Sequence, residues 1–309
     1  MKDSNLRLVF MGSPDFAVPA LRALAERFSV VGVVTQPDRP AGRGRTLTPP
    51  PVKILADELG LPSIQPEKLR LPEPMEQLKA WAPELIVVAA YGQILKPAVL
   101  ELPAYGCINI HASLLPRWRG AAPISAAILH GDAQTGITIM CMESGVDTGP
   151  IISQRDTPIG PHETAGGLAE RLASLGAELI IETLPGYLNG SLKPKPQDGS
   201  AATYAPMLKK EDGELNFNRP AVELERLVRA FQPWPGAFML WQGQLLKIQR
   251  AGVAHLSGEK QPPPGQRMLY KGLPAISTVE GLLVLEEIQP AGKKPMPGKV
   301  FLQGARNWM

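Results

Sequence analysis

Asn109 and His111 stand two residues apart within the otherwise apolar stretch "CINIHA". In an extended strand, positions i and i+2 face the same side, so the amide and the imidazole point the same way. An amide N–H can hold a developing oxyanion, and an imidazole can pass a proton near neutral pH. Asp147, downstream in "ESGVDTGP", can orient that imidazole and favour its protonated form. The three side chains together predict acyl chemistry at the end of a strand.

Other interpretations of these residues stay open at this point. His111 could be a hydrogen-bonded polar residue at a strand end with no catalytic role. A Ser113–His111–Asp147 hydrolase is disfavoured, because no GxSxG elbow surrounds Ser113 and a nucleophile two residues from its base is awkwardly placed. The "HETAG" stretch lacks the second histidine of HExxH, since Gly166 occupies that position, so we expect no metal.

The elements around the trio predict a Rossmann-like parallel sheet. Apolar runs that read as buried strands alternate with helical patterns, the strands at 6–12, 30–35, 84–92 and 106–112 and the helices at 16–28 and 51–60. Strands that are apolar on both faces are typical of a parallel sheet covered by helices on both sides. The first strand is followed by "GSPDFA" and not by GxGxxG, which disfavours a nicotinamide dehydrogenase.

Asp147 falls in the loop of a predicted strand–loop–strand unit, 135–142 and 151–156, and a long helix over 164–188 follows. We therefore assign residues 1–189 to a catalytic domain and the Pro-, Gly- and Ser-rich residues 190–208 to a linker. Residues 209–309 combine a helix at 220–231 with short strands and Gly/Pro turns, which predicts a small antiparallel, OB-like β-barrel.

Composition narrows the function classes. The net charge of the chain is +3, yet residues 190–309 hold 16 Lys+Arg against 10 Asp+Glu, a balance of +6, while residues 1–189 hold 16 against 19. A basic second part suits a polyanionic partner or a solvated surface. Cys107 and Cys141 lack CxxC spacing and read as reduced, buried thiols. No apolar run is long enough to cross a bilayer and no targeting segment is evident, so we expect a cytoplasmic protein with no membrane partner. We also expect a monomer.

The motifs resemble those of the folate-dependent formyltransferases. The stretch "NIHASLLPRWRGAAP" joins the N-x-H pair to an SLLP turn, and "GVDTGPII" follows at matching spacing. Further likeness comes in order from "GSPDFAVPAL", "VVTQPDRPAGRGR", "VVAAYGQIL" and "IQPAGKKPM", so it covers nearly the whole chain. The resemblance is strongest to the branch of the family that formylates initiator methionyl-tRNA.

The resemblance implies a reaction and a set of site residues. The family transfers the formyl group of 10-formyltetrahydrofolate to an amine, here the α-amine of methionine on the initiator tRNA. Asn109, His111 and Asp147 match its catalytic trio, with no covalent intermediate and no metal. The resemblance places folate against the turn Ser113, Leu114, Leu115 and Pro116 and against the backbone of Tyr91, Gly92, Gln93, Ile94 and Leu95.

The basic loop after residue 36 carries Arg39, Arg43 and Arg45 with one acid, Asp38. Composition alone favours a solvated loop. In the family this insertion reaches the acceptor end of tRNA, where arginines suit phosphates and splayed bases. The resemblance also implies that Lys209, Lys210 and the basic second domain hold the tRNA body.

Arg117 and Arg119 either meet tRNA phosphates or brace the turn. Pro297 and Gly298 stand where relatives would begin a helix, so a C-terminal helix is not predicted. The alternatives in function are a folate-dependent formyltransferase acting on a small amine, such as a sugar nucleotide or ribonucleotide, and a non-catalytic RNA-binding protein.

Overall fold

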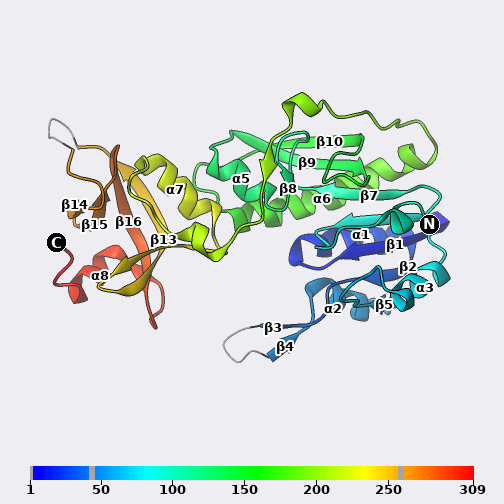
Figure 1. The fold of residues 1–309 in the computed structure, drawn as a ribbon, viewed down its shortest axis with the longest axis horizontal. Coiled ribbons are helices and arrows are strands. Elements are labelled where there is room, and N and C mark those ends of the chain that lie inside the picture. Colours follow the sequence, from blue (N-terminus) through cyan, green and yellow to red (C-terminus); the bar gives the residue numbers. More distant parts are fainter. Residues whose placement is uncertain (1–2, 42–45, 257–260) are drawn as a thin grey trace. The chain divides into compact units, whose positions relative to one another are not determined.

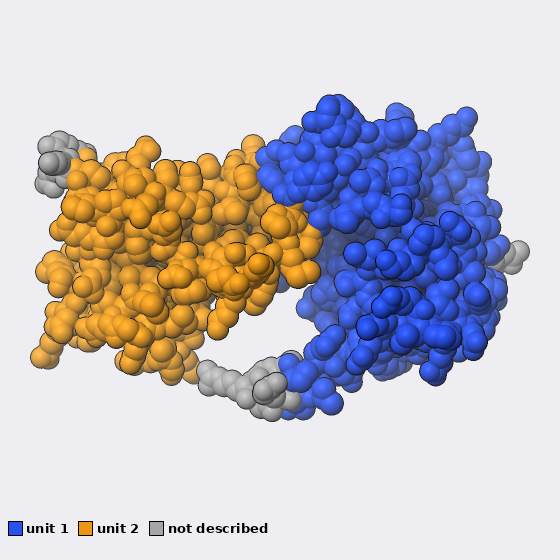
Figure 2. Space-filling view, viewed as in Figure 1, with its two compact units in different colours: residues 1–120, 134–158, 169–204 blue, residues 121–133, 159–168, 205–309 orange. Residues whose placement is uncertain are grey.

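A computed structural model describes residues 3–41, 46–256 and 261–309 (Figure 1). The chain forms two compact units, shown in two colours in Figure 2. Unit 1 comprises residues 1–120, 134–158 and 169–204, and unit 2 comprises residues 121–133, 159–168 and 205–309. The units are therefore interleaved along the chain, because the short segments 121–133 and 159–168 belong to unit 2 although residues of unit 1 flank them.

Unit 1 contains a seven-stranded sheet of order β10-β9-β7-β6-β1-β2-β5. Its pairs β2/β5, β1/β2, β1/β6 and β6/β7 are parallel, and β7/β9 and β9/β10 are antiparallel. The strands are β1 (Asp3–Gly12), β2 (Phe28–Val34), β5 (Ser63–Ile64), β6 (Leu85–Ala89), β7 (Cys107–His111), β9 (Gln134–Cys141) and β10 (Ile151–Pro158). The predicted Rossmann-like fold is confirmed, and β7 is its last parallel strand.

Helices join and cover these strands. Proline lies at the first or second position of α1 (Val18–Arg27), α2 (Pro51–Glu58), α3 (Pro72–Ala80) and α4 (Pro97–Leu100). Proline suits these positions because its missing N–H is one that a helix start leaves unpaired. The predicted long helix is α6 (Ala165–Leu188). Short elements complete the unit: η1 (Asp15–Ala17), β3 (Arg39–Ala41), β4 (Thr46–Thr48), β8 (Arg119–Gly120) and η2 (Gly199–Ala201), with β11 (Tyr204–Ala205) at its end.

Two glycines show how closely the helices approach the sheet. A Cβ on Gly32 of β2 would lie 2.2 Å from the ring of Trp81, which follows α3. A Cβ on Gly176 of α6 would lie 2.9 Å from Ile110 in β7. Every position of β6 is buried. The sheet is thus packed on both faces, and β7 ends in a rigid frame.

Unit 2 contains a six-stranded antiparallel sheet of order β12-β13-β16-β15-β14, with β17 on β16. The predicted antiparallel second domain is confirmed. Its elements are α5 (Pro123–Leu129), η3 (Lys210–Gly213), α7 (Ala221–Ala230), β12 (Ala237–Trp241), β13 (Gln244–Ala254), β14 (Arg267–Tyr270), β15 (Leu273–Ser277), β16 (Leu282–Pro290), β17 (Met296–Pro297) and α8 (Gly298–Gly304).

The helix α8 corrects the expectation drawn from Pro297 and Gly298. Pro297 precedes the first turn with extended backbone (ψ 142°) and Gly298 begins the helix. A Cβ on Gly298 would lie 2.2 Å from the Leu285 carbonyl oxygen, so glycine lets the helix start directly on the sheet. Phe301 of this helix packs edge-on against Trp241, 5.0 Å between ring centres, and this aromatic contact holds the helix in place.

Candidate active site

The carboxyl end of β7 carries Asn109 and His111 on one face of the sheet. Asn109 lies beside Val88 of β6 and Met140 of β9, and His111 lies beside Thr138. Asn109 is half-buried, whereas His111 is only 5% exposed. The strand therefore holds the imidazole in a fixed, largely dry position.

The proton arrangement of the His111 ring follows from its partners. Nε2 lies 3.0 Å from the carbonyl oxygen of Trp118. A carbonyl oxygen can only accept, so Nε2 carries a hydrogen whether the ring is neutral or charged. Nδ1 is then the nitrogen that gains or loses a proton, and it faces the Asp147 carboxylate, 3.7 Å from Oδ2.

Asp147 comes from the loop between β9 and β10, as predicted. Its Oδ2 accepts a hydrogen bond of 2.8 Å from the backbone N–H of Gly120. Its backbone is left-handed, with φ +52°, a conformation that non-glycine residues rarely adopt. Gly149 of the same loop leaves no room for a side chain, because a Cβ there would lie 2.0 Å from the Cys141 carbonyl oxygen. The loop is tightly packed, and it presents the carboxylate to the imidazole.

The turn after β7, residues 112–120, is held by internal hydrogen bonds. Ser113 donates through Oγ to the Arg117 carbonyl at 2.6 Å, and its own carbonyl accepts from Thr138 Oγ1 at 2.6 Å. Leu115 is buried, its N–H donates to Thr138 Oγ1 at 3.1 Å and its carbonyl accepts from Gln154 Nε2 at 2.9 Å. Of the predicted folate turn, Ser113 and Leu115 are thus internal, and Leu114 and Pro116 are half-buried.

The second predicted folate segment follows β6. The Tyr91 ring is buried and its carbonyl accepts from Gln36 Nε2 at 3.1 Å. Gly92 has φ +84°, and Gln93 is tied to the chain before α3 by hydrogen bonds with Pro66 and Leu69. Ile94 is 74% exposed and Leu95 is buried. Backbone groups and Ile94 are therefore what this segment can offer to a ligand.

The two arginines of the turn differ. Arg119 is 6% exposed and donates through Nε and an Nη to Gln197 Oε1, at 3.0 and 2.7 Å. Arg117 is exposed, with its guanidinium 4.3 Å from the centre of the Trp118 ring. Arg119 therefore braces the turn, and only Arg117 is placed to meet an outside partner.

The predicted tRNA-binding residues are exposed wherever the structure describes them. Arg39 begins a short hairpin in which β3 pairs with β4, and all three residues of β4 are exposed. Arg43 and Arg45 lie outside the described residues. In unit 2, Lys209 and Lys210 are exposed at η3, next to Glu211 and Asp212. The local charge at η3 is therefore balanced.

Both cysteines are free thiols in unit 1. Cys107 at the start of β7 is buried, and this burial raises the pKa of its thiol to about 12. Burial also raises the pKa of the half-buried Cys141, whose Sγ lies 3.7 Å from the Tyr187 hydroxyl. Neither thiol is activated as a nucleophile.

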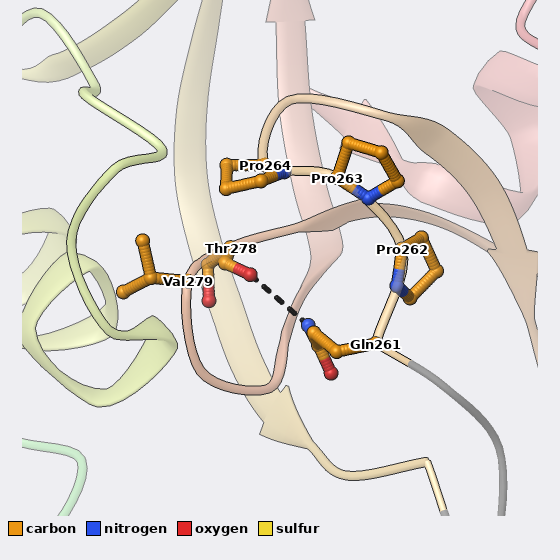
Figure 3. A pocket seen from close by; sticks show the side chains of 6 residues that line it. All are labelled: Gln261, Pro262, Pro263, Pro264, Thr278 and Val279. Carbon is orange, nitrogen blue, oxygen red and sulfur yellow. Dashed lines mark hydrogen bonds between the residues drawn. The ribbon is translucent and has the colours of Figure 1, made fainter.

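Within residues 3–41, 46–256 and 261–309, no three His, Cys, Asp or Glu residues come together as a metal ion would require, and no helix has the length and apolarity to span a membrane. An open pocket of about 630 Å³ in unit 2 is lined by Gln261, three prolines (262–264), Thr278 and Val279 (Figure 3). The Gln261 amide donates to the Thr278 carbonyl at 3.0 Å. None of these six lining residues titrates, so the pocket is not the candidate for acyl chemistry.

Comparison with known proteins decides the family. Residues 6–184 match the model of the formyl transferase family, and residues 207–306 match that of the formyl transferase C-terminal domain. The chain belongs to the formyl transferase family.

Relatives within that family cover nearly all of the chain. A protein from Myxococcus xanthus named methionyl-tRNA formyltransferase is 51% identical over 97% of this chain and 96% of its own. One of the same name from Chloroflexus aggregans is 49% identical, covering 97% of both. An N-formyltransferase of Helicobacter canadensis, solved with folinic acid and dTDP-3-aminofucose, shares the fold with a TM-score of 0.65 at 18% identity, covering 92% of this chain and 99% of that one.

Several residues that shape this candidate site were not found from sequence. Trp118 contributes a backbone carbonyl, which no side-chain pattern reveals. Gln197 lies in the stretch assigned to a linker, yet it donates to the carbonyls of Asp147 and Gly149 at 2.8 and 2.7 Å. Thr203 Oγ1 accepts from the Trp118 N–H at 2.9 Å. The only sequence signal for them is polar residues in a segment of otherwise small residues.

Proposed function

We propose that this chain transfers the formyl group of 10-formyltetrahydrofolate to the α-amine of methionyl initiator tRNA, giving N-formylmethionyl-tRNA. The observation that carries the proposal is a His111 ring whose Nδ1 faces Asp147 while Asn109 shares its face of β7. Relatives of about half-identical sequence with the matching name support the choice of acceptor. The reaction would take place in the cytoplasm, where initiator tRNA is charged, and the chain would act as a monomer.

In the proposed reaction the methionine nitrogen attacks the formyl carbon directly. The carbonyl electron pair moves to oxygen, and the oxyanion is stabilised by the Asn109 amide and the protonated His111 ring. The attacking nitrogen loses a proton, the bond from carbon to folate N10 breaks, and N10 gains a proton. His111 Nδ1 is the exchangeable site for this transfer, since Nε2 stays bonded to Trp118.

Asp147 has a supporting role in the proposal. Its carboxylate faces and stabilises the imidazolium, and the hydrogen bond from the Gly120 N–H keeps the carboxylate oriented. No covalent enzyme intermediate is required, which agrees with the two unactivated thiols and with Ser113, whose hydroxyl is bonded to the Arg117 carbonyl. Alignment of the two substrates supplies much of the rate.

Folate is proposed to lie between the turn Ser113–Pro116 and the segment Tyr91–Leu95, and the hairpin carrying Arg39 is proposed to contact the tRNA acceptor end. A second unit does not by itself exclude a small acceptor, since the sugar N-formyltransferase fold aligns over 92% of this chain. The identity to the tRNA-acting relatives is what favours tRNA.

The test is formation of formylmethionine by the purified chain with 10-formyltetrahydrofolate and methionyl initiator tRNA. A dTDP-amino sugar replaces the tRNA in a parallel reaction. Transfer to tRNA and none to the sugar supports the proposal. Transfer to the sugar alone supports the small-amine alternative, and no transfer to either supports a non-catalytic RNA-binding role.

A further inference from the structure

The groups that hold the His111 ring come from two loops, and both loops have left-handed backbone at the critical residue. Trp118, whose carbonyl accepts from Nε2, has φ +61°, and Asp147, whose carboxylate faces Nδ1, has φ +52°. Such conformations persist in non-glycine residues only where their surroundings hold them. The position of His111 relative to both partners therefore depends on whatever fixes these two loops.

One pair of side chains links the two loops. Arg119 follows Trp118 directly, is 6% exposed, and donates twice to Gln197 Oε1. The Nε2 of the same Gln197 amide donates to the carbonyls of Asp147 and Gly149. The Asp147 residue is thus held at both ends, its carbonyl by Gln197 and its carboxylate by the Gly120 N–H.

The chemistry of this pair is unusual for a purely structural contact. A buried arginine is usually neutralised by a carboxylate, but here the guanidinium donates to a neutral amide. An amide can accept from the arginine and donate to the loop at the same time, which a carboxylate cannot do. Glutamine is the residue whose reach and polarity suit both tasks.

We propose that Arg119 and Gln197 are positioning residues that set the distance between Asp147 and His111 Nδ1. They act through Asp147 and Trp118 and do not touch substrate. This inference rests on the proposed function, because it uses formyl transfer as its readout. We call the hydrogen-bonded pair Arg119 and Gln197 the clamp. Its loss should lower kcat and leave the KM for both substrates unchanged, since misplacement of a reacting group by about 1 Å costs about a hundredfold in rate.

Two substitutions distinguish the role of the accepting Oε1 of Gln197 from that of its donating Nε2. Gln197→Ala removes both contacts. Gln197→Glu keeps the acceptor for Arg119, as an ion pair, but has no N–H to give to Asp147 and Gly149. We expect kcat to fall by about tenfold to a hundredfold in both variants, with KM for 10-formyltetrahydrofolate and for methionyl-tRNA within twofold of wild type. The melting temperature of each variant is measured beside kcat, so that a loss of rate caused by unfolding is recognised.

Asp198→Ala is the matched control in the same segment. Asp198 is exposed and accepts from Ser200, so its loss loosens the segment without touching the clamp. We expect wild-type kcat for it. A double-mutant cycle with Arg119→Ala gives a further test: if the two residues act as one clamp, the double variant is no slower than the slower single variant.

The outcomes distinguish the two proposals. If the wild type does not formylate methionyl-tRNA, the proposed function fails. If the wild type is active and Gln197→Glu retains full kcat, the clamp is overturned and the function stands. Equal losses in Gln197→Glu and Asp198→Ala, or a rise in KM without a change in kcat, would also overturn it, because the segment would then serve folding or substrate binding.

Discussion

The turn after β7 and the hairpin after β2 both carry arginines beside a proline, yet they are built in opposite ways. In the turn, Ser113, Leu115 and Arg119 are buried and hydrogen-bonded within unit 1. In the hairpin, Arg39, Pro40 and Leu47 are exposed, and the two strands pair over three residues each. The difference fits the tasks proposed for the two regions, since a proton transfer requires fixed atoms, whereas contact with phosphates requires accessible charge.

The largest expected effect comes from a substitution in the rigid region, at the end of β7. His111→Asn removes the only titratable ring on β7 and keeps a polar side chain of similar bulk. We expect kcat for formyl transfer to fall by about 10²–10⁴, because general acid–base catalysis contributes about that much. Single-turnover rates with saturating 10-formyltetrahydrofolate and methionyl-tRNA measure it. A variant that keeps a tenth or more of the wild-type rate would exclude His111 as the proton carrier.

The next effect tests the hairpin. Arg39→Ala should raise the KM for methionyl-tRNA, leave kcat unchanged, and reduce the slope of log KM against log salt by about 1, as expected when one phosphate contact is lost. Arg22→Ala is a control of equal charge, since Arg22 is half-exposed on α1 and paired with Glu58 at 3.7 Å. Equal salt slopes in the two variants would remove the hairpin from the tRNA interface.

The same comparison explains how much could be inferred from sequence. Asn109 and His111 were placed correctly at the end of β7 because strand periodicity is local. Asp147 was placed in the right loop because two strand patterns flank it. The fold class followed from apolar runs that alternate with helices, which the structure confirms.

What sequence missed depends on contacts between distant segments. Gln197 bonds to Asp147 across 50 positions, and the role of Arg119 depends on that glutamine. The β3–β4 pairing escaped because the strands are only three residues long and the three residues of β4 are all exposed, which gives no hydrophobic period. Helix α8 was missed because Gly298 looks like a helix breaker, whereas its value lies in the absence of a Cβ beside Leu285.

The pH dependence of the free energy of unfolding tests how well the region around β7 excludes water, through the buried thiol of Cys107 at the start of that strand. Burial raises the pKa of its thiol from 9.0 to about 12. Between these values the unfolded chain loses the proton first, so the free energy of unfolding falls as pH rises from about 9 to 12, by at most about 1.4 kcal/mol per pH unit. Urea unfolding of Cys107→Ala between pH 8 and 10.5 should show a shallower decline than wild type.

Cys141→Ala is the comparison for that measurement, because this thiol is half-buried and its bond with Tyr187 opposes the rise in its pKa. Its effect on the slope should be smaller than that of Cys107→Ala. Identical slopes for wild type and Cys107→Ala would mean that the thiol reaches water in the folded chain.

The smallest expected effect concerns the buried hydroxyl of Tyr91, in the segment that follows β6. Tyr91 is 2% exposed, and within the described residues its hydroxyl has no hydrogen-bond partner, whereas the Tyr187 hydroxyl donates to the Tyr105 carbonyl at 2.9 Å. Tyr91→Phe should leave the free energy of unfolding unchanged or raise it by up to about 1–2 kcal/mol, while Tyr187→Phe lowers it by about 0.5–1.5 kcal/mol. The KM for 10-formyltetrahydrofolate should not change in Tyr91→Phe. The proposed contacts of the Tyr91–Leu95 segment with folate are made by its backbone, and the Tyr91 carbonyl keeps its bond with Gln36. A loss of stability in Tyr91→Phe as large as in Tyr187→Phe would show that the hydroxyl is satisfied in solution, and that this part of the core admits water.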